Sequence, residues 1–318
     1  MLSVTPCKNQ ISRTLSFTTG DNTMEMSHHI NQETCERCGL CAEICPNSII
    51  DIEESKDIYF RKDRLGLCIR CGHCMAICPT QSVIAPELSY EKDFFDLPKS
   101  GIDSESFFNL ISTRRAVRIY RKKPVPRDVL EKIVEAISLA PMGFPPHKVE
   151  ITIIRRREDI ERALPFMVKF YEDLQKWISN PISCFFMKRK LKPEVFNTLK
   201  NHIVPMMKIK LPDMKNNGED IITRGAPVLF LFHANRAAEN HSEDLFIDLT
   251  YGFLAAHALG LGATPISLVP PAVERTPELR NLFQIPDENE VLGSMIIGYL
   301  VRRFKRGIRR KLANVSWI

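Results

Sequence analysis

The twelve residues CERCGLCAEICP at 35–46 return almost unchanged as CIRCGHCMAICP at 68–79. Each copy arranges four cysteines as C-x2-C-x2-C-x3-C-P, and each cysteine of the second copy lies 33 positions after its counterpart. The likeness continues past the prolines, where residues 48–50 (SII) correspond to residues 82–84 (SVI). A repeat at a fixed spacing predicts two copies of one supersecondary unit.

This cysteine spacing resembles the ligand run of bacterial two-cluster ferredoxins, in which the fourth cysteine of a run binds the other cluster. The resemblance implies two [4Fe–4S] clusters, one on Cys35, Cys38, Cys41 and Cys78 and the other on Cys68, Cys71, Cys74 and Cys45. Structural zinc and a radical-generating cluster are the alternatives. Zinc sites usually combine two C-x2-C pairs without the third cysteine and the proline. A radical cluster would use C-x3-C-x2-C, an order absent from this sequence.

The composition is that of a two-domain protein with a large core, because 44% of the 318 residues are hydrophobic. The longest apolar runs, such as residues 228–232, are too short to cross a bilayer, so we expect a soluble protein with no membrane partner. Eight of the ten cysteines lie in the two repeats. This usage favours metal sites in a reducing, cytoplasmic compartment over a disulfide framework.

The net charge of +6 is unevenly distributed, since residues 25–88 carry a net charge of −4. The basic residues of the remainder are scattered, apart from a run at 302–311. A solvated tail or a phosphate-binding strand end accounts for that run, so we expect no nucleic acid partner. Residues 1–24 are rich in Ser and Thr and leave three interpretations open: an organellar transit peptide, an unstructured leader, or a start at a later methionine.

The composition changes after Pro86, and we divide the chain accordingly. We expect a flexible leader at 1–24, a ferredoxin-type domain at 25–88, a linker at 89–106 and a second domain at 107–318.

The second domain mixes helical and strand patterns, which predicts an α+β fold. Leu130, Ile133 and Ile137 form one helical stripe. Residues 157–215 contain no strand candidate, and we expect a helical cap or lid there. The remaining predicted elements are strands at 149–154, 228–232 and 290–300 and a helix at 244–259.

Four stretches of this domain resemble, in the same order, the nitroreductase family of FMN-dependent oxidoreductases. They are STRRAVRIY from Ser112, APMGFPPHKVEITII from Ala140, AAHALGLGATPIS from Ala255 and IIGYL from Ile296. Together with the cysteine repeats, they make the chain similar to ferredoxin–nitroreductase fusions. The resemblance implies a mainly antiparallel sheet flanked by helices, FMN as the organic cofactor, and a homodimer with FMN at the subunit interface. The apolar helix at 245–259 offers hydrophobic surface for such a contact.

Three arginines of the first stretch suit a phosphate group. We expect Arg114 and Arg118 on one face at the end of an amphipathic helix, and guanidinium groups match phosphate oxygens well. The usual serine of the family is Ala116 here. The positions that hold the FMN phosphate and ribityl chain in the family correspond to Arg114, Arg115, Ala116 and Arg118. The basic residues that close on the phosphate after the last strand match Arg306, Arg309 and Lys311, and the sequence does not choose among these three.

The resemblance places two other stretches at the flavin ring. In PMGFPPH, Pro145 stands where the family has Asn and His147 where it has Gln, so Met142, Gly143 and Pro145 would line the cofactor by backbone and packing. His147 is a candidate proton donor, and a merely polar surface role is its alternative. In family members, the segment that follows the positions of Gly260 and Gly262 places a backbone amide beside flavin N5. The residues that inherit this place are Pro265, Ile266 and Ser267.

The two halves together predict an iron–sulfur flavoprotein oxidoreductase. Reduced ferredoxin or a similar low-potential donor would load the clusters with single electrons, and FMN would pass electron pairs to a small organic acceptor. Family members act on nitroaromatics, quinones, activated alkenes and halogenated rings, among which the sequence does not choose. The alternative is an electron-transfer or redox-sensing flavoprotein that serves a protein partner and has no small substrate.

Overall fold

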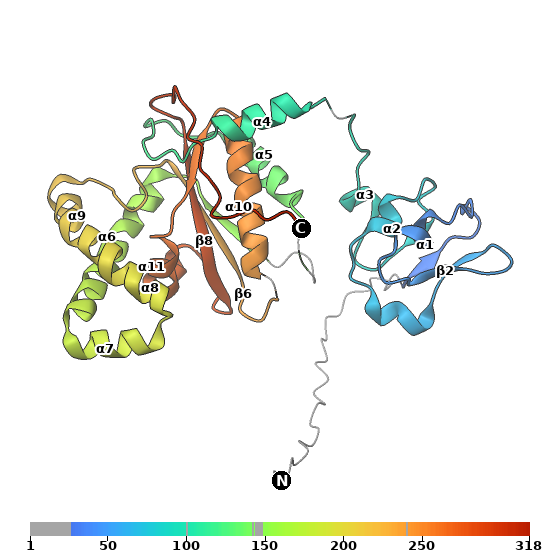
Figure 1. Ribbon diagram of the computed structural model, residues 1–318, viewed down its shortest axis with the longest axis horizontal. Coiled ribbons are helices and arrows are strands. Elements are labelled where there is room, and N and C mark those ends of the chain that lie inside the picture. Colours follow the sequence, from blue (N-terminus) through green and yellow to red (C-terminus); the bar gives the residue numbers. More distant parts are fainter. Residues whose placement is uncertain (1–26, 100, 142, 144–148, 240) are drawn as a thin grey trace, which may run out of the picture. The chain divides into compact units, whose positions relative to one another are not determined.

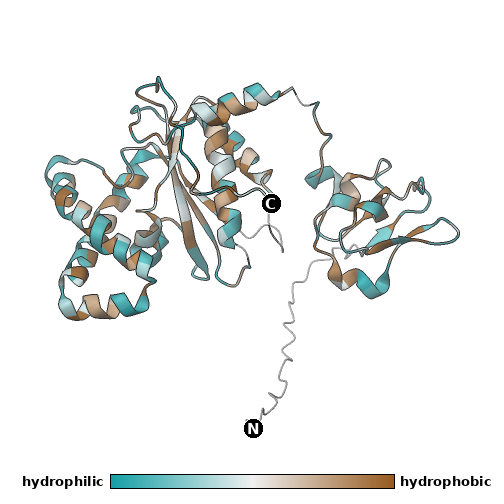
Figure 2. Ribbon diagram, viewed as in Figure 1, coloured by the Kyte–Doolittle hydropathy of each residue, from teal (hydrophilic) through white to brown (hydrophobic). Residues whose placement is uncertain are grey.

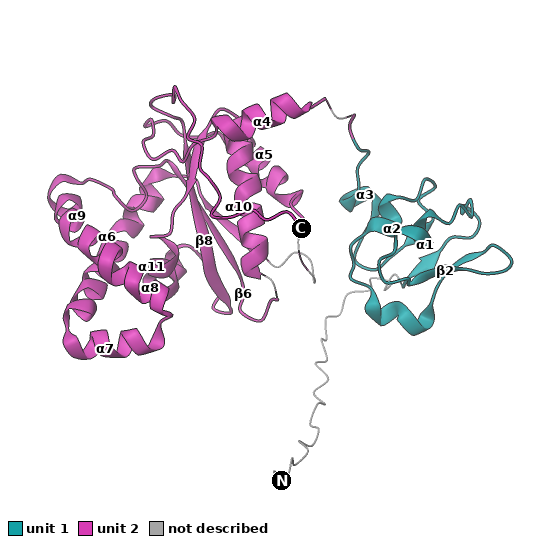
Figure 3. Ribbon diagram, viewed as in Figure 1, with its two compact units in different colours: residues 1–97 teal, residues 98–318 magenta. Residues whose placement is uncertain are grey.

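The computed structural model describes residues 27–99, 101–141, 143, 149–239 and 241–318. The chain forms two compact units, residues 1–97 and residues 98–318 (Figure 3). This division falls inside the linker expected at 89–106. Part of that stretch is folded, because Tyr90 and Phe94 pack on the core of the first unit and helix α4 begins at Ser104.

The first unit repeats one backbone motif. Its elements are the strands β1 (His29–Ile30), β2 (Ile50–Ile52), β3 (Ile58–Phe60) and β4 (Val83–Ile84), the helices α1 (Leu40–Ile44), α2 (His73–Ala76) and α3 (Tyr90–Asp93), and the 3-10 turn η1 (Lys62–Leu67). Gly39 before α1 and Gly72 before α2 both adopt the left-handed conformation, with φ of 79° and 72°. Arg37 and Arg70, two residues earlier, also have positive φ. Tight turns of this kind let a short loop direct several side chains inward.

Two small sheets close this unit. Strands β2 and β3 form an antiparallel hairpin, and β1 pairs antiparallel with β4, which follows the second cysteine repeat. Between them lies a small core that includes Ile50, Ile58, Met75 and Val83. The repeats are therefore held together by apolar side chains as well as by whatever their cysteines bind.

The second unit is an α+β domain (Figure 1). Its strands are β5 (Val149–Ile154), β6 (Val228–Asn235), β7 (Gly262–Pro265) and β8 (Asn289–Gly298). Its helices are α4 (Ser104–Thr113), α5 (Arg127–Ser138), α6 (Arg157–Ser179), α7 (Pro181–Lys190), α8 (Pro193–Thr198), α9 (Val204–Asn217), α10 (His241–Ala258), α11 (Pro270–Arg275) and α12 (Pro277–Leu282), with the π-helical turn η2 (Leu199–Ile203) before α9. The strands form one fully antiparallel sheet in the order β5-β6-β8-β7. The predicted fold class is confirmed.

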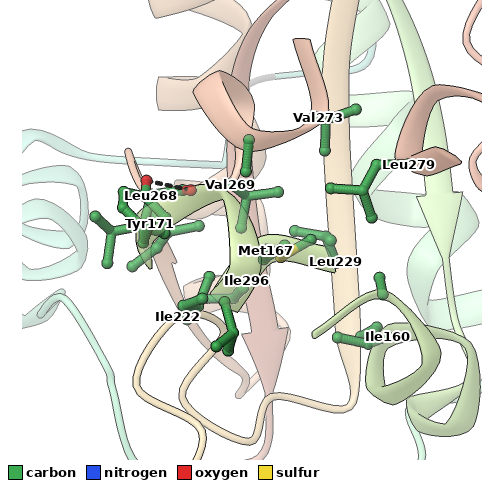
Figure 4. Close-up of a cluster of buried hydrophobic side chains, with 14 of the residues drawn as sticks. Ile160, Met167, Tyr171, Ile222, Leu229, Leu268, Val269, Val273, Leu279 and Ile296 are labelled. Atoms are coloured by element: carbon green, nitrogen blue, oxygen red, sulfur yellow. Dashed lines mark hydrogen bonds between the residues drawn. The ribbon is translucent and has the colours of Figure 1, made fainter. Parts of the chain in front are cut away.

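Strand β6 anchors helices on both faces of the sheet, because successive side chains of a strand point to opposite sides. Phe230 and Phe232 are buried in a core shared with α5 and α10. Leu229 and Leu231 are buried in the other core, with Met167 of α6 (Figure 4). Each such side chain contributes about 1.5–3 kcal/mol when it is fully buried. The sheet is thus the middle layer between two layers of helices (Figure 1).

The apolar stripe of helix α10 packs inside the second unit. Leu245, Leu249 and Ala256 are buried against α5 and the sheet. A subunit contact of α10 would therefore use its opposite face. The apolar side chains that α10 leaves exposed are Phe246 and Tyr251.

Residues 157–217, which are described throughout, contain helices and no strand, as expected from the sequence. Helix α6 is tied to the segment that follows β7, because the hydroxyl of Tyr171 donates a hydrogen bond of 2.7 Å to the carbonyl of Leu268 (Figure 4). This bond and the surrounding core fix the position of the cap relative to the end of β7.

Candidate functional site

The eight repeat cysteines are free thiols, and no described cysteine forms a disulfide. In the first repeat, Cys38 is exposed and Cys41 is buried. Burial, with smaller contributions from the neighbouring Cys78 and Cys35, raises the pKa of Cys41 to about 11. The fourth cysteine of the second repeat therefore lies beside the first repeat.

The second group mirrors the first. Burial, with smaller contributions from Cys71, Cys68 and Cys45, raises the pKa of Cys74 to about 12. Cys45, Cys68, Cys71 and Cys74 also line one cavity. The structure thus gathers the two crossed sets that the ferredoxin resemblance implies. No three His, Cys, Asp or Glu side chains within the described ranges lie close enough to hold a single metal ion.

Backbone amides point at the fourth cysteine of each repeat. The N–H of Ile49 lies 3.4 Å from Sγ of Cys45, and the N–H of Ser82 lies 3.3 Å from Sγ of Cys78. Burial would raise the pKa of Cys78, but the hydrogen bonds from Ser82 and Thr80 outweigh it and lower that pKa. Such N–H···S contacts favour thiolates, the form that binds iron. The donor sets therefore fit iron–sulfur clusters.

The arginines of the second unit do not lie on a helix. Helix α4 ends at Thr113, and Arg114 is already extended, with φ −61° and ψ 137°. The shared helical face expected for Arg114 and Arg118 is therefore wrong. Residues 116–118 instead run beside β7: Ala116 forms a parallel bridge with Ala263, whose carbonyl accepts the N–H of Val117. Position 262 of β7, which faces Val117, must be a glycine, because a Cβ there would lie 2.6 Å from the Val117 side chain.

Within the part of the chain that the structure describes, these arginines have no acidic partner. Of the described carboxylates, none forms a salt bridge with Arg114, Arg115 or Arg118. Nε of Arg115 is buried and has no hydrogen-bond partner among the described residues. Burial and the charge of Arg115 lower the pKa of Arg114. A cluster of cations without counterions fits a phosphate group.

Arg115 also connects α4 to the chain after β8. Its Nη1 donates to the carbonyl of Ser112 at 2.8 Å, and its Nη2 approaches the carbonyl of Arg306 at 3.4 Å. This contact brings the backbone of Arg306 to the arginine cluster. Arg309 lies on the same exposed segment and has no described contact that places its side chain.

Two residues that the sequence analysis did not select join this cluster from α10. Nε2 of His257 lies 3.0 Å from the hydroxyl of Thr113, and the guanidinium of Arg114 stacks over Phe253 at 4.8 Å. Burial, followed by the charges of Arg114 and Arg115, lowers the pKa of His257. The only sequence feature that pointed to His257 and Phe253 was their position on the helix of the AAHALGLGATPIS stretch.

Every second residue of the segment at the end of β7 is exposed to solvent. Pro265 and Ser267 are exposed, whereas Ile266 is buried and exchanges hydrogen bonds with Ser294 of β8. The backbone N–H of Ser267 donates to no atom of the described residues. A free amide in an exposed position can bind an acceptor atom of a ligand.

The loop between α5 and β5 is described only in part. Met142, Pro145 and His147 lie outside the described residues. The N–H of Gly143 donates to Oδ1 of Asp244 at 2.7 Å. Gly143 therefore lies against the start of α10.

Two cavities meet at Ser267. The larger, of about 840 Å³, lies beneath the cap helices α6, α7 and α8. The smaller, of about 410 Å³, lies between α10, α11 and the edge formed by β7 and β8. Ser267, Pro271 and Arg275 line both cavities. The expected flavin-edge segment is thus the boundary between them.

Comparisons with known proteins agree with this architecture. The model of the nitroreductase family matches residues 111–299, which is more than half of the chain. The chain belongs to the nitroreductase family. A 4Fe-4S dicluster domain matches residues 34–84, ahead of the nitroreductase domain. The predicted fusion of a ferredoxin-type domain with a nitroreductase domain is confirmed.

Individual relatives are distant. Iodotyrosine deiodinase 1 of Rattus norvegicus is 22% identical over 204 residues, which span 62% of each protein, so the match covers less than two thirds of that relative. A nitroreductase with bound FMN from Bacteroides fragilis is 18% identical and covers 66% of this chain and 97% of its own, with a TM-score of 0.49. An FMN-dependent nitroreductase from Clostridium difficile is 15% identical, covers 68% and 100%, and has a TM-score of 0.45.

Among the described residues, no helix combines the length and the apolar character that crossing a membrane requires.

Proposed function

We propose that this chain is an iron–sulfur flavoprotein oxidoreductase. It takes electrons from a low-potential donor such as reduced ferredoxin, carries them through two [4Fe–4S] clusters and FMN, and delivers them to an oxidised organic acceptor. The two halves divide the work, since clusters handle single electrons and a flavin exchanges electrons both singly and in pairs.

The residues for each cofactor follow from the contacts described above. The crossed cysteine sets would hold the clusters. Arg114 and Arg118, whose guanidinium groups have no acidic partner among the described residues, would bind the FMN phosphate. Arg115 would support them while it ties the chain after β8 in place. The free N–H of Ser267 would donate to the flavin ring. His147 remains a predicted proton donor, with Arg306 and Arg309 as predicted phosphate contacts.

The observation that carries the proposal is the meeting of two cavities at Ser267. One cavity borders the segment expected to contact the flavin, and the other can hold a second molecule directly beside it. Ligand pockets typically have volumes of about 300–1,000 Å³. This arrangement favours an enzyme with a small-molecule acceptor over a carrier that serves only a protein partner.

The functional form would be a homodimer in a reducing compartment. Apolar side chains are exposed on α4, on the outer face of α10 and along the chain after β8, as expected of surfaces that a second copy covers. These residues are Phe107, Phe108, Ile111, Phe246, Tyr251, Phe304, Ile308 and Leu312.

Anaerobic purification followed by iron, sulfide and flavin analysis tests the proposal. Each chain should contain about eight iron atoms and eight acid-labile sulfides, as two cubanes require, and one FMN. The reduced flavin should then be reoxidised by organic acceptors without oxygen. Stoichiometric zinc without sulfide, or a chain that binds no flavin after reconstitution, would contradict it.

A further inference from the structure

The cavity beneath the cap has an unusually apolar wall for its size. Its volume is about 840 Å³, and aromatic or aliphatic side chains supply most of its lining, among them Phe170, Leu174, Trp177 and Phe186. Figure 2 shows the same hydrophobic colouring along the middle of α7. Small polar acceptors do not need such a wall, because they bury little apolar surface.

The charged side chains of this cavity lie at two places, and Ser183 and Thr198 add hydroxyl groups to the wall between them. Lys190 and Glu194 are exposed, at the ends of α7 and α8. Ser267 and Arg275 lie at the opposite boundary, where the second cavity begins. Arg275 forms no salt bridge with any described carboxylate, so its charge is free to face a ligand.

We propose that the acceptor is an amphipathic molecule: its reducible, oxygen-bearing head lies at Ser267 and Arg275, and its large hydrocarbon body fills the cavity beneath α7 and α8. This inference rests on the proposed function and names the substrate class of that site. Two electrons from the reduced donor and two protons from water reduce the head. Arg275 stabilises negative charge that develops on the head oxygen before protonation. The hydrocarbon body contributes binding through burial alone.

A series of 2-alkyl-1,4-naphthoquinones, from methyl to octyl, tests this proposal in the anaerobic, cofactor-loaded protein. Their kcat/KM should rise with chain length, by up to roughly fourfold for each methylene that is buried. Binding is followed separately by tryptophan fluorescence. The chain has two tryptophans, so a Trp317→Phe background leaves Trp177, which lines the cavity, as the reporter.

Two adjacent phenylalanines of α7 supply a matched pair of variants. Phe185 and Phe186 are equally exposed, at 55% and 57%, but only Phe186 lines the cavity. Phe186→Ser should weaken binding and kcat/KM for the octyl quinone about tenfold and leave the methyl quinone unchanged. Phe185→Ser should alter neither by more than about twofold. Arg275→Gln should lower kcat/KM for both quinones and leave Trp177 quenching by the octyl compound in place.

The outcomes separate this inference from the proposed function. Equal kcat/KM across the series, with no chain-length effect on Trp177, overturns the amphipathic acceptor even when the flavin is reoxidised. The same result would follow if a segment of a second copy filled the cavity. Failure of every quinone to reoxidise the flavin overturns the proposed function, and the Trp177 titration still decides whether the cavity binds the hydrocarbon body.

Discussion

Individual side chains decide whether the second unit can bind FMN. Replacing both Arg114 and Arg118 by Ala should weaken FMN binding roughly a hundredfold or more, because each charge-assisted hydrogen bond to phosphate contributes about 1.5–3 kcal/mol. Flavin absorbance after gel filtration measures the loss, and iron content should stay unchanged. Arg156→Ala with Arg162→Ala removes the same charge from exposed side chains elsewhere on the unit and serves as the control. Full flavin occupancy in the first double variant would refute the phosphate assignment.

A buried carboxylate on α10 makes stability depend on pH. Burial, with a smaller contribution from the charge of Asp244, raises the pKa of Asp248 to about 6. A folded-state pKa above the unfolded value means that the folded state binds more protons between pH 4 and 6, so stability falls as pH rises through this window. Asp248→Asn should therefore stabilise the second unit at pH 7.5 by on the order of 2 kcal/mol.

The measurement is the thermal unfolding midpoint of the wild-type and Asp248→Asn proteins at several pH values. The gain should shrink towards pH 5, where the wild-type carboxyl becomes protonated and loses its unfavourable charge. An equal gain at both ends of the range would mean that charge burial at Asp248 does not control the effect.

At the scale of elements, the cysteine that follows each of the helices α1 and α2 lies with the cysteines of the other repeat. Cys45→Ala should damage the cluster held by Cys68, Cys71 and Cys74, so iron should fall from about eight to about four atoms per chain. Adding Cys71→Ala should cause little further loss, because both changes affect one cluster. Adding Cys38→Ala should remove the rest. Cys184 is a free cysteine in the second unit, so Cys184→Ala should leave the iron content unchanged. If Cys71→Ala rather than Cys38→Ala removed the remaining iron, Cys45 would not belong to the cluster of the second repeat.

For the whole molecule, the exposed apolar surfaces predict an obligate dimer. Sedimentation of the cofactor-loaded protein at micromolar concentration should give twice the chain mass of 36.4 kDa. Phe246→Glu should shift it towards monomers and release flavin. Ile182→Glu on α7, which changes a side chain of nearly equal exposure (70% against 68%), should not. A wild-type monomer that retains tight flavin is incompatible with a shared site.

Because a cluster domain is joined to the flavin domain in one chain, we predict that electrons reach the flavin through the clusters. Reduced ferredoxin, or dithionite-reduced viologen, should reduce the flavin far faster than NADH or NADPH does, because the clusters accept single electrons and nicotinamides deliver hydride. Stopped-flow absorbance of the flavin band measures both rates. Cys38→Ala with Cys71→Ala should abolish reduction by ferredoxin without emptying the flavin site. Rapid reduction by NADH in that double variant would show that the clusters are not the inlet.

Local patterns in the sequence were sufficient for much of this architecture. The cysteine repeat predicted the cluster domain because its spacing alone determines which side chains a short loop can direct inward. The strand at 228–232 was predicted because a buried strand needs continuous hydrophobic residues. The strand at 149–154 was also predicted, although only Ile154 of it is fully buried. The order of four short stretches was enough to predict the nitroreductase domain.

Long-range contacts decided the rest. The sequence suggested that the arginines continue a helix, but helix α4 ends at Thr113, and Ala116 pairs with Ala263 of β7, which is far from it in the chain and adjacent in space. The apolar helix at 245–259 was expected to offer surface for a subunit contact, and the tertiary structure decides which face it can offer, because α5 and the sheet cover Leu245 and Leu249. His257, Phe253 and the cavity beneath the cap carry no local signal. Only the tertiary structure brings such residues together, because their roles depend on neighbours that sequence distance does not reveal.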